Sequence, residues 1–329
     1  MNNSSPYIRS GNSELGISVD FIIAALPAII WSAIAYGARP IAIVILSIGF
    51  SLLFDYLFCL VFKKDMHLPT AAVIGMITAM FMPAGVSYWI VPVTALLSLI
   101  VRRLTRGILH PIASALLPFF FIGREMTAHT KIFESLKLGA FSYADRMDEL
   151  AVTMPVDILT PENGPNITAF DAFIGNAPEA IGTMSAILIL LGGIYLMVRG
   201  NISWHTPVGI IAGASLVWFF MLFDGAHYNY LIYHLCSGGV FLAAFFAATE
   251  YSSSPTVKFG RLVHGIACGI LLMFLRTLGI NAAMSVVLAM IIVSLFSRVI
   301  DMITCESYFG HRSKKLANRL KTLLPNFKK

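Results

Sequence analysis

The chain has 329 residues, of which 57% are hydrophobic and only 12% are charged. Water-soluble domains contain about 45–50% apolar and about 25% charged residues, so this chain has too few charges to cover a surface that faces water. The composition therefore excludes an ordinary soluble enzyme and predicts an all-α integral membrane protein.

Apolar stretches near the roughly 20 residues that a helix needs to cross a bilayer recur along the whole chain. They predict about ten transmembrane helices, at residues 18–37, 40–62, 69–86, 87–102, 107–123, 179–198, 204–223, 231–249, 259–278 and 280–300. The first 17 residues are polar and lack the pattern of a cleaved targeting peptide, so we expect the first span to direct insertion.

These spans divide the chain into five regions. We expect an N-terminal tail at 1–17, a first five-helix half at 18–123, an outer loop at 124–178, a second five-helix half at 179–300 and a basic tail at 301–329. A basic cluster followed by a glycine occurs at the corresponding place in each half, ending at Gly107 and at Gly279. Together with the odd number of spans per half, this pattern predicts two inverted repeats.

The distribution of basic residues predicts the orientation. Lys and Arg residues near span ends are retained on the cytoplasmic side of a membrane. With both termini inside, the cytoplasmic segments hold 17 of the 23 Lys and Arg residues. We therefore expect both termini in the cytoplasm and the loop at 124–178 outside. The basic tail fits anionic lipid better than nucleic acid, because it directly follows a span.

Asp55 is the ionisable residue that lies deepest within a predicted span. An ionised group in hydrocarbon costs several kcal/mol, so it requires a partner or a water-filled path. Two interpretations of Asp55 stay open, a residue of a cation path and a paired residue that stabilises helix packing. His234, Glu250 and Arg276 lie closer to span ends and favour the packing interpretation.

Small residues gather within several predicted spans. Gly265 and Gly269 have the spacing that lets two helices approach closely. The run Ser237-Gly238-Gly239 fits close packing as well, but it could also leave room for a flat cofactor against the backbone. The four cysteines stand apart without metal-ligand spacing, and no catalytic or metal-binding motif is present in the sequence.

Several motifs resemble a known family. They are Thr168-Ala-Phe-Asp-Ala-Phe-Ile-Gly-Asn-Ala-Pro-Glu-Ala-Ile-Gly-Thr-Met-Ser185, His234-Leu-Cys-Ser-Gly-Gly239, Phe245-Phe-Ala-Ala-Thr-Glu-Tyr251 and Phe309-Gly-His-Arg312. In this order they resemble the NqrB subunit of sodium-translocating NADH:quinone oxidoreductase and, more closely, the RnfD subunit of the Rnf complex. The resemblance extends over nearly the whole chain.

The resemblance implies a ten-helix subunit of a complex that passes electrons between ferredoxin and NAD and drives Na⁺ or H⁺ across the membrane. Members carry FMN joined through its phosphate to a threonine of the outer loop, in a motif that this loop does not keep in full. Thr160 keeps the Thr-Pro pair of that motif and is the first choice, and Thr153 is the second. Ser237, Gly238 and Gly239 are expected beside a flavin ring, and a second, noncovalent flavin stays open.

The sequence thus predicts a subunit of an Rnf-type translocase in a bacterial or archaeal cytoplasmic membrane, with no complete active site of its own. FMN would relay electrons, Asp55 would belong to the ion path, and the partners would be further membrane and peripheral subunits and a flavin transferase. Two alternatives stay open. One is a flavin-free structural subunit of the same complex, and the other is a stand-alone secondary transporter or channel.

Overall fold

The computed structural model describes residues 13–63, 67–105, 111–116, 127–128, 151–152, 169–175, 179–221, 230–249 and 254–304. Helices make up almost all of this part of the chain. They are α1 (Glu14–Tyr36), α2 (Arg39–Phe62), α3 (Leu68–Met80), α4 (Ile90–Thr105), α6 (Ala169–Ile174), α7 (Ala186–Val198), α8 (His205–Met221), α9 (Tyr230–Cys236), α10 (Val240–Leu242), α11 (Lys258–Thr277), α12 (Ala282–Leu295) and α13 (Ser297–Thr304). A 3₁₀ turn, η1 (Pro111–Ala115), and a π-helical turn, η5 (Ala243–Ala247), complete the helical elements.

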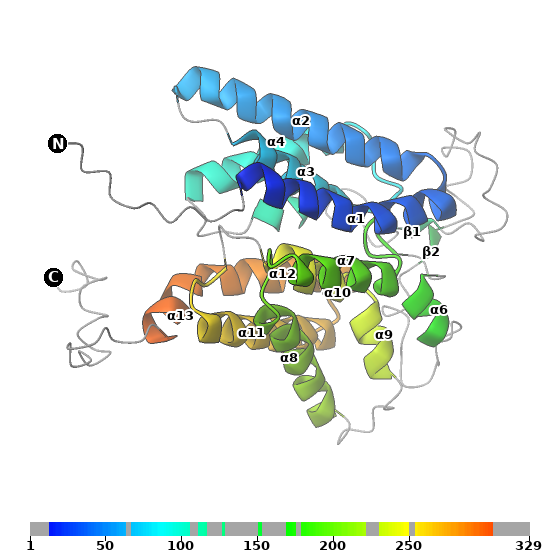
Figure 1. Cartoon of the computed structure of the whole chain (residues 1–329). Helices are drawn as coiled ribbons and strands as arrows, with labels where there is room; N and C mark the ends of the chain where they lie inside the picture. The colour runs from blue at the N-terminus through cyan, green and yellow to red at the C-terminus, as the bar shows by residue number, and fades with distance from the viewer. Residues whose placement is uncertain are drawn as a thin grey trace, which may run out of the picture.

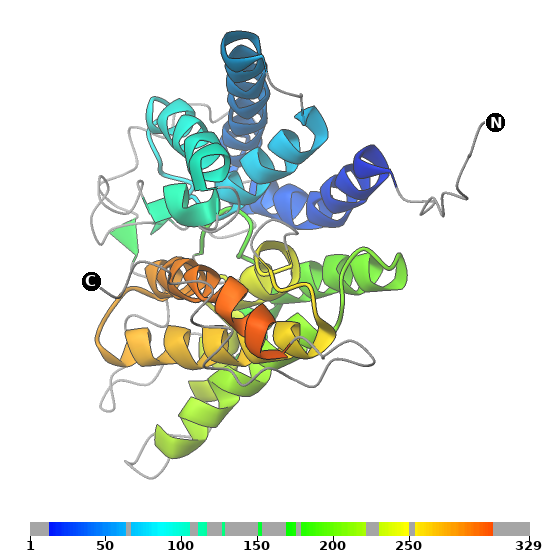
Figure 2. The same ribbon diagram turned by 90° about the vertical axis from the view of Figure 1, so that its left-hand side faces the viewer.

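The helices form two groups that follow the order of the chain. In Figure 1 and Figure 2, α1 to α4 lie together on one side and α7 to α13 on the other, with α1 and α7 at the boundary. Two short strands, β1 (Thr127–Ala128) and β2 (Ala151–Val152), pair antiparallel. The first group comes from residues that precede these strands, and the second from residues that follow them.

Local sequence explains where the first helices begin and end. The Ser13 hydroxyl caps α1 by accepting a hydrogen bond from the amide of Gly16 at 3.1 Å. Pro40 lies in the first turn of α2, where its missing amide hydrogen has no helical partner to lose. At the other end of α2, Lys63 adopts a left-handed conformation (φ 50°) and stops the helix.

Among the described residues, three single helices, α1, α2 and α11, are long and apolar enough to cross a membrane. Together α12 and α13 form a fourth candidate span, bent by 52°. These four match the spans expected at 18–37, 40–62, 259–278 and 280–300, whereas α3, α7 and α8 are shorter apolar helices. Among the expected regions, 107–123 and the loop at 124–178 lie mostly outside the described residues, as do most of both tails.

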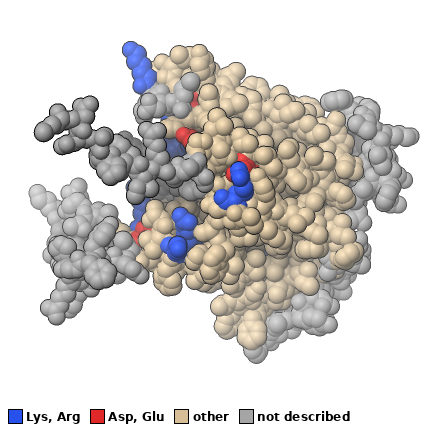
Figure 3. Space-filling model, in the orientation of Figure 1, with Lys and Arg blue, Asp and Glu red and all other residues tan. Residues whose placement is uncertain are grey.

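The outer surface is apolar over a wide area. Large apolar side chains such as Ile45, Val198 and Phe220 are more than half exposed. Contiguous apolar surface of this extent is rare on soluble proteins and is what lipid chains require. In Figure 3 most of the visible face carries no charge, and its coloured side chains lie mainly toward the left.

One end of the molecule collects basic residues, and we call it the basic end. It is the end where α1 and α11 begin and where α2 and α4 end (Figure 1). Its basic residues are Lys63, Arg102, Arg103, Arg199, Lys258 and Arg261.

Glycines bring α8 and α11 into close contact, as expected for Gly265 and Gly269. A side-chain carbon on Gly269 would overlap with the carbonyl oxygen of Ile210 on α8, and one on Gly265 would meet the carbonyl of Thr206 at 2.6 Å. Packing therefore accounts for this pair of glycines.

Three expected spans are shorter as helices than the apolar stretches that predict them. The stretch 231–249 divides into α9, α10 and η5 because Gly238 and Gly239 adopt positive φ angles of 71° and 78°. Within 69–86 the helix ends at Met80, and within 179–198 it begins only at Ala186. Hydropathy averaged over the length of a span does not reveal such breaks, whose local signals are Pro83 and the pair Gly238-Gly239.

We expect Gly269→Ala to lower the free energy of unfolding of the detergent-solubilised protein by about 1–3 kcal/mol, and with it the melting temperature. The reason is that the added methyl group would collide with the backbone of α8. Gly49→Ala on α2 is the matched control, since nothing lies within 4 Å of its added carbon. Melting curves of the two variants, in which size-exclusion chromatography measures the protein that remains folded after heating, would be compared. Equal melting temperatures would contradict the close packing of α8 and α11.

Candidate functional site at two broken helices

The break between α9 and α10 leaves backbone groups without helical partners. Ser237, Gly238 and Gly239 separate the two helices, and all three are buried. Buried backbone amides and carbonyls that water cannot reach must bind other groups of the protein. The polar side chains that bind these backbone groups therefore form the candidate site.

Glu179 binds the donor side of the break. Its carboxylate accepts hydrogen bonds from the hydroxyl of Ser237 and from the amide of Gly238, the latter at 3.1 and 3.0 Å. The hydroxyl of Thr183 donates to its second oxygen at 3.2 Å. Tyr36 fixes the backbone of Glu179 by donating to its carbonyl at 2.8 Å and accepting from its amide at 2.9 Å. Both carboxylate oxygens of Glu179 are thus bound.

Arg276 binds the acceptor side of the same break. Its guanidinium donates to the carbonyl of His234, to the carbonyl of Ser237 at 3.1 Å and to the hydroxyl of Ser285 at 3.2 Å. Carbonyls at the C-terminal end of a helix carry a partial negative charge, which a cation stabilises. A buried carboxyl group and a buried guanidinium group therefore hold the two sides of the break.

A second break follows α3 and meets the first. The amides of Ile181 and Gly182 donate to the carbonyls of Met82 and Met80, at 3.0 and 2.8 Å. The ring of Phe81 lies 3.1 Å from where a side-chain carbon of Gly239 would be. Main-chain hydrogen bonds thus join the two halves at this point.

An arginine also binds the segment after α3. Arg39, at the start of α2, donates to the carbonyl of Val86 at 2.9 Å and lies 5.0 Å from the ring of Tyr88. Each half therefore has non-helical backbone whose carbonyls are bound by a buried arginine.

The chain that leaves the loop at 124–178 is tied to α1. The indole nitrogen of Trp31 donates to the carbonyl of Gly175 at 3.2 Å, and Tyr36 holds Glu179 four residues further on. The end of the loop is thus connected through Glu179 to the break between α9 and α10.

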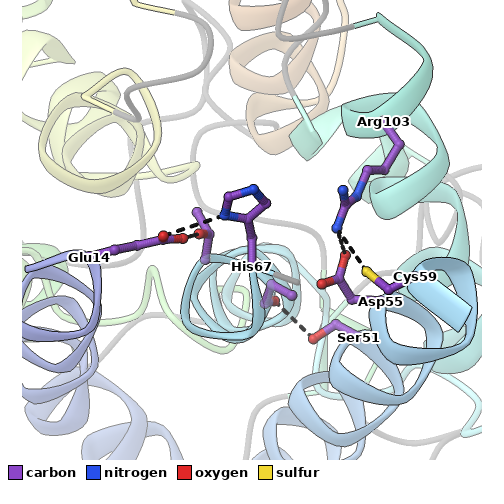
Figure 4. Close-up of polar contacts among 8 residues, drawn as sticks. Glu14, Ser51, Asp55, Cys59, His67 and Arg103 are labelled. Atoms are coloured by element: carbon purple, nitrogen blue, oxygen red, sulfur yellow. Dashed lines mark hydrogen bonds and ion pairs between the residues drawn. The ribbon is translucent and has the colours of Figure 1, made fainter. Parts of the chain in front are cut away.

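Asp55 lies on a polar stripe of α2. Ser47, Ser51, Asp55 and Cys59 recur every four residues, and all are buried. The hydroxyls of the two serines donate to carbonyls of α3, and Arg103 of α4 donates to Asp55 Oδ1 at 2.6 Å (Figure 4). Within the part of the chain that the structure describes, Asp55 Oδ2 is buried and has no hydrogen-bond partner.

Comparison with Asp20 shows how unusual that oxygen is. Asp20 Oδ1 accepts from Tyr195 at 3.0 Å and from Arg199, and its Oδ2 accepts from Arg199 and, at 2.8 Å, from Asn201. Glu179 is saturated in the same way. Of these three buried carboxylates, only Asp55 has an oxygen that accepts no hydrogen bond.

The structure separates the site residues expected from the sequence. Ser237, Gly238 and Gly239 form the break between α9 and α10, where side chains fill the space beside both glycines. Asp55 lies apart from them, toward the basic end. Thr160 and Thr153 lie outside the described residues.

Sequence reasoning missed Glu179 and the partners of Arg276 and Asp55. The signal for Glu179 is a lone acidic residue at the edge of an apolar run. No sequence signal pairs Asp55 with Arg103, since they are 48 residues apart and their contact depends on how α2 packs against α4.

Interrupted apolar helices with buried ionisable groups at the breaks define a multi-pass helical membrane protein. Comparison of the sequence with protein families is more specific. The profile of the NQR2, RnfD, RnfE family matches residues 1–310, and the chain belongs to this family. The resemblance noted from the sequence motifs is thereby confirmed.

Two of the curated relatives match over most of their length, and a third matches over a shorter segment. The chain is 29% identical over 284 residues to the D subunit of the Na⁺-translocating ferredoxin:NAD⁺ oxidoreductase complex of Acetobacterium woodii, covering 84% of this chain and 85% of the relative. It is 24% identical over 320 residues to the D subunit of the proton-translocating ferredoxin:NAD⁺ oxidoreductase complex of Clostridium ljungdahlii, covering 94% and 96%. The D subunit of an ion-translocating oxidoreductase complex of Alcanivorax borkumensis is 37% identical over 131 residues, or 39% of this chain and 37% of the relative.

We expect Glu179→Gln to destabilise the protein by about 1–3 kcal/mol, because the amide nitrogen of glutamine cannot accept the hydrogen bonds that the carboxylate accepts. Combining it with Arg276→Gln should cost less than the sum of the two single changes, since both residues hold one break. Melting temperatures of the purified protein would test this double-mutant cycle. Strictly additive effects would show that Glu179 and Arg276 act independently.

Proposed function

We propose that this protein is the RnfD subunit of an Rnf-type complex, which couples electron transfer between ferredoxin and NAD to the translocation of Na⁺ or H⁺. The family match and the names of the two relatives that match over most of their length support this proposal. These relatives translocate different ions, so the family alone does not select one. The observation on which the ion-translocating role depends is the buried Asp55 with one open oxygen.

Asp55 provides a place for a cation within the membrane-spanning part of the protein. A carboxylate oxygen is a ligand that Na⁺ and H⁺ both favour, and a buried carboxylate with an open oxygen binds a cation to reduce the cost of its burial. The hydroxyls of Ser47 and Ser51 and the carbonyls of α3 that they contact continue the polar stripe toward the middle of α2. We assign this stripe to the ion path.

An FMN on the loop at 124–178 would serve as the electron relay. We propose Thr160 as its attachment site and Thr153 as the second choice. A phosphoester link keeps the flavin within reach of partner cofactors, while the protein supplies position and electrostatics. The link from Gly175 through Glu179 to the break supports a role for this loop next to the membrane-embedded centre. Ser237, Gly238 and Gly239 remain the proposed contact of the flavin ring, and the ring would displace the side chains that fill the space beside the two glycines. A second, noncovalent flavin is a further proposal, without an assigned site.

We propose ten spans in two inverted repeats, with both termini on the cytoplasmic side of a bacterial or archaeal cytoplasmic membrane. Two observations support this topology. The third and the eighth expected spans, at 69–86 and 231–249, occupy the same place in the two halves, and both of them break. The cluster of basic residues at the basic end is what retention on the cytoplasmic side requires. Peripheral subunits and a flavin transferase would be the further partners.

A stand-alone secondary transporter is the second candidate function. Broken helices beside buried charged groups are also typical of secondary transporters, where they bind substrate and coupling ions. A transporter would work without partner subunits and without flavin, whereas the proposed subunit requires both. A flavin-free structural subunit would require partners only.

We expect mass spectrometry of the intact protein, produced together with its flavin transferase, to detect one covalently bound FMN on the loop at 124–178. The Thr160→Ala variant should lose the adduct, because a threonine oxygen forms the phosphoester, and Thr153→Ala should keep it. Peptide mapping would locate the site. An unmodified loop, under conditions in which the transferase modifies a known substrate, would favour the flavin-free alternatives.

We expect Asp55→Asn to reduce ion transport by the assembled complex by about tenfold or more, because a neutral amide no longer attracts a cation into the membrane. Ion uptake into inverted membrane vesicles, driven by reduced ferredoxin and NAD, would measure this effect. Asp20→Asn is the matched control, since Asp20 is also buried but has both oxygens bound. Unchanged transport in the Asp55 variant would remove Asp55 from the ion path.

A further inference from the structure

We infer that Arg103 competes with the transported cation for Asp55 and so controls how tightly the site holds that cation at the basic end of the molecule. This inference rests on the proposed role of Asp55 in the ion path. It adds a residue that determines affinity for the ion, on a helix other than the one that carries the carboxylate.

The first argument is the need for charge balance. Asp55 is fully buried in a candidate membrane span, where an unpaired carboxylate is costly. A path that delivers a cation to Asp55 must also let the cation leave, and the carboxylate then needs a substitute. Arg103 is that substitute, because its guanidinium donates to Asp55 Oδ1 at 2.6 Å.

The second argument is the one-sided geometry of the pair. Arg199 binds both oxygens of Asp20, as is typical of a permanent ion pair between an arginine and a carboxylate. Arg103 contacts one oxygen of Asp55 and leaves Oδ2 open on the side away from the guanidinium (Figure 4). A cation can therefore bind Oδ2 before Arg103 departs.

The third argument is the position of Arg103 on its helix. It lies in the last turn of α4, at the basic end, and 14% of its side chain is exposed whereas none of the Asp55 side chain is. Long basic side chains near the end of a span can extend their charged group toward the membrane surface while the aliphatic part stays in apolar surroundings. Arg103 therefore has a second position at the aqueous interface, within the reach of one side chain.

The fourth argument concerns what the guanidinium covers. The nitrogen of Arg103 that binds Asp55 also lies 3.5 Å from Cys59 Sγ, and the guanidinium carbon lies 5.3 Å from the centre of the Phe58 ring. Cys59 is the last member of the polar stripe and the nearest to the basic end. Arg103 thus closes the stripe where a cation would enter or leave it.

These contacts define an exchange that conserves charge. In one state Asp55 is neutralised by Arg103, and in the other by a cation on Oδ2 while Arg103 faces the interface. No bond is made or broken apart from ionic and hydrogen bonds. Hydroxyl and carbonyl oxygens of the stripe, such as those of Ser51 and Ala71, are hard ligands that suit Na⁺. We therefore use Na⁺ as the probe.

The test is the Na⁺ dependence of ferredoxin:NAD oxidoreductase activity of the intact complex in membrane vesicles. We expect Arg103→Gln to lower the Na⁺ concentration for half-maximal activity by about tenfold, because the competing cation is gone. It should also lower the maximal rate, because Na⁺ then leaves slowly. Arg103→Lys should behave like the unchanged protein, and Arg102→Gln, in the same turn, is the matched control. An unchanged half-maximal concentration in Arg103→Gln, or no dependence on Na⁺ at all, would overturn the inference.

Labelling of Cys59 gives a second readout that does not depend on turnover. In a variant that keeps Cys59 as its single cysteine, we expect a maleimide to react faster as Na⁺ is raised, because Arg103 moves away from the thiol. With Asp55→Asn added, the reaction rate should not depend on Na⁺. A rate that is independent of Na⁺ with Asp55 present would count against movement of Arg103.

The two proposals fail in different ways. Normal ion transport in Asp55→Asn would refute the ion path itself. Another set of results would refute only the role of Arg103. Asp55→Asn would lose transport, Arg103→Gln would keep its Na⁺ dependence, and the rate of Cys59 labelling would not depend on Na⁺. A third outcome would assign the pair a structural role instead. In that case Arg103→Gln lowers the melting temperature, the double variant with Asp55→Asn restores it, and the Na⁺ dependence of activity does not change.

Discussion

The structure depends on the satisfaction of backbone hydrogen bonds where helices break within an apolar environment. A continuous helix binds its own amides and carbonyls, but the break leaves the amide of Gly238 and the carbonyls of His234 and Ser237 to other partners, and no water replaces those bonds in hydrocarbon. Glu179 supplies the acceptors and Arg276 the donors. Because these residues come from three separate segments, the break, the segment before α7 and the end of α11 have to assemble together. This requirement fixes the end of α11 and the segment before α7 relative to the break.

The buried carboxylates show how the same residue type serves different purposes. Asp20 and Glu179 have donors on both oxygens and hold helices together. Asp55 has a donor on one oxygen only. Stability favours complete pairing, so an open oxygen at a fully buried position points to a ligand that comes and goes. The number of carboxylate oxygens that accept hydrogen bonds, rather than burial or depth in a span, distinguishes the proposed ion site from the structural pairs.

Sequence patterns were informative where physical chemistry acts locally. Span length and apolar composition predicted α1, α2, α11 and the bent pair of α12 and α13, since a helix in lipid is set mainly by hydrophobicity. The spacing of Gly265 and Gly269 predicted close packing, which α8 provides. The family could be recognised because its motifs cluster around the breaks.

Other features could not be read from the sequence because they depend on contacts between distant segments. Pro83 explains why α3 ends where it does, but the sequence does not show what binds the carbonyls that this end leaves free. The carbonyls of Met80 and Met82 accept from the amides of Gly182 and Ile181, about 100 residues further along the chain. The choice of Arg103 as the partner of Asp55, rather than Lys63 or Arg102 at the same end, is decided by the packing of α2 against α4. A single sequence does not show which distant residues come into contact.

The main-chain bonds between the two breaks also constrain the order in which the chain can fold during synthesis. The carbonyls of Met80 and Met82 bind the amides of Ile181 and Gly182, so about 100 further residues must be made before these bonds can form. Until then the nascent first half carries exposed carbonyls at its broken helix and has only part of its final contacts. The first half therefore reaches its final set of main-chain hydrogen bonds only after the segment just before α7 has been synthesised.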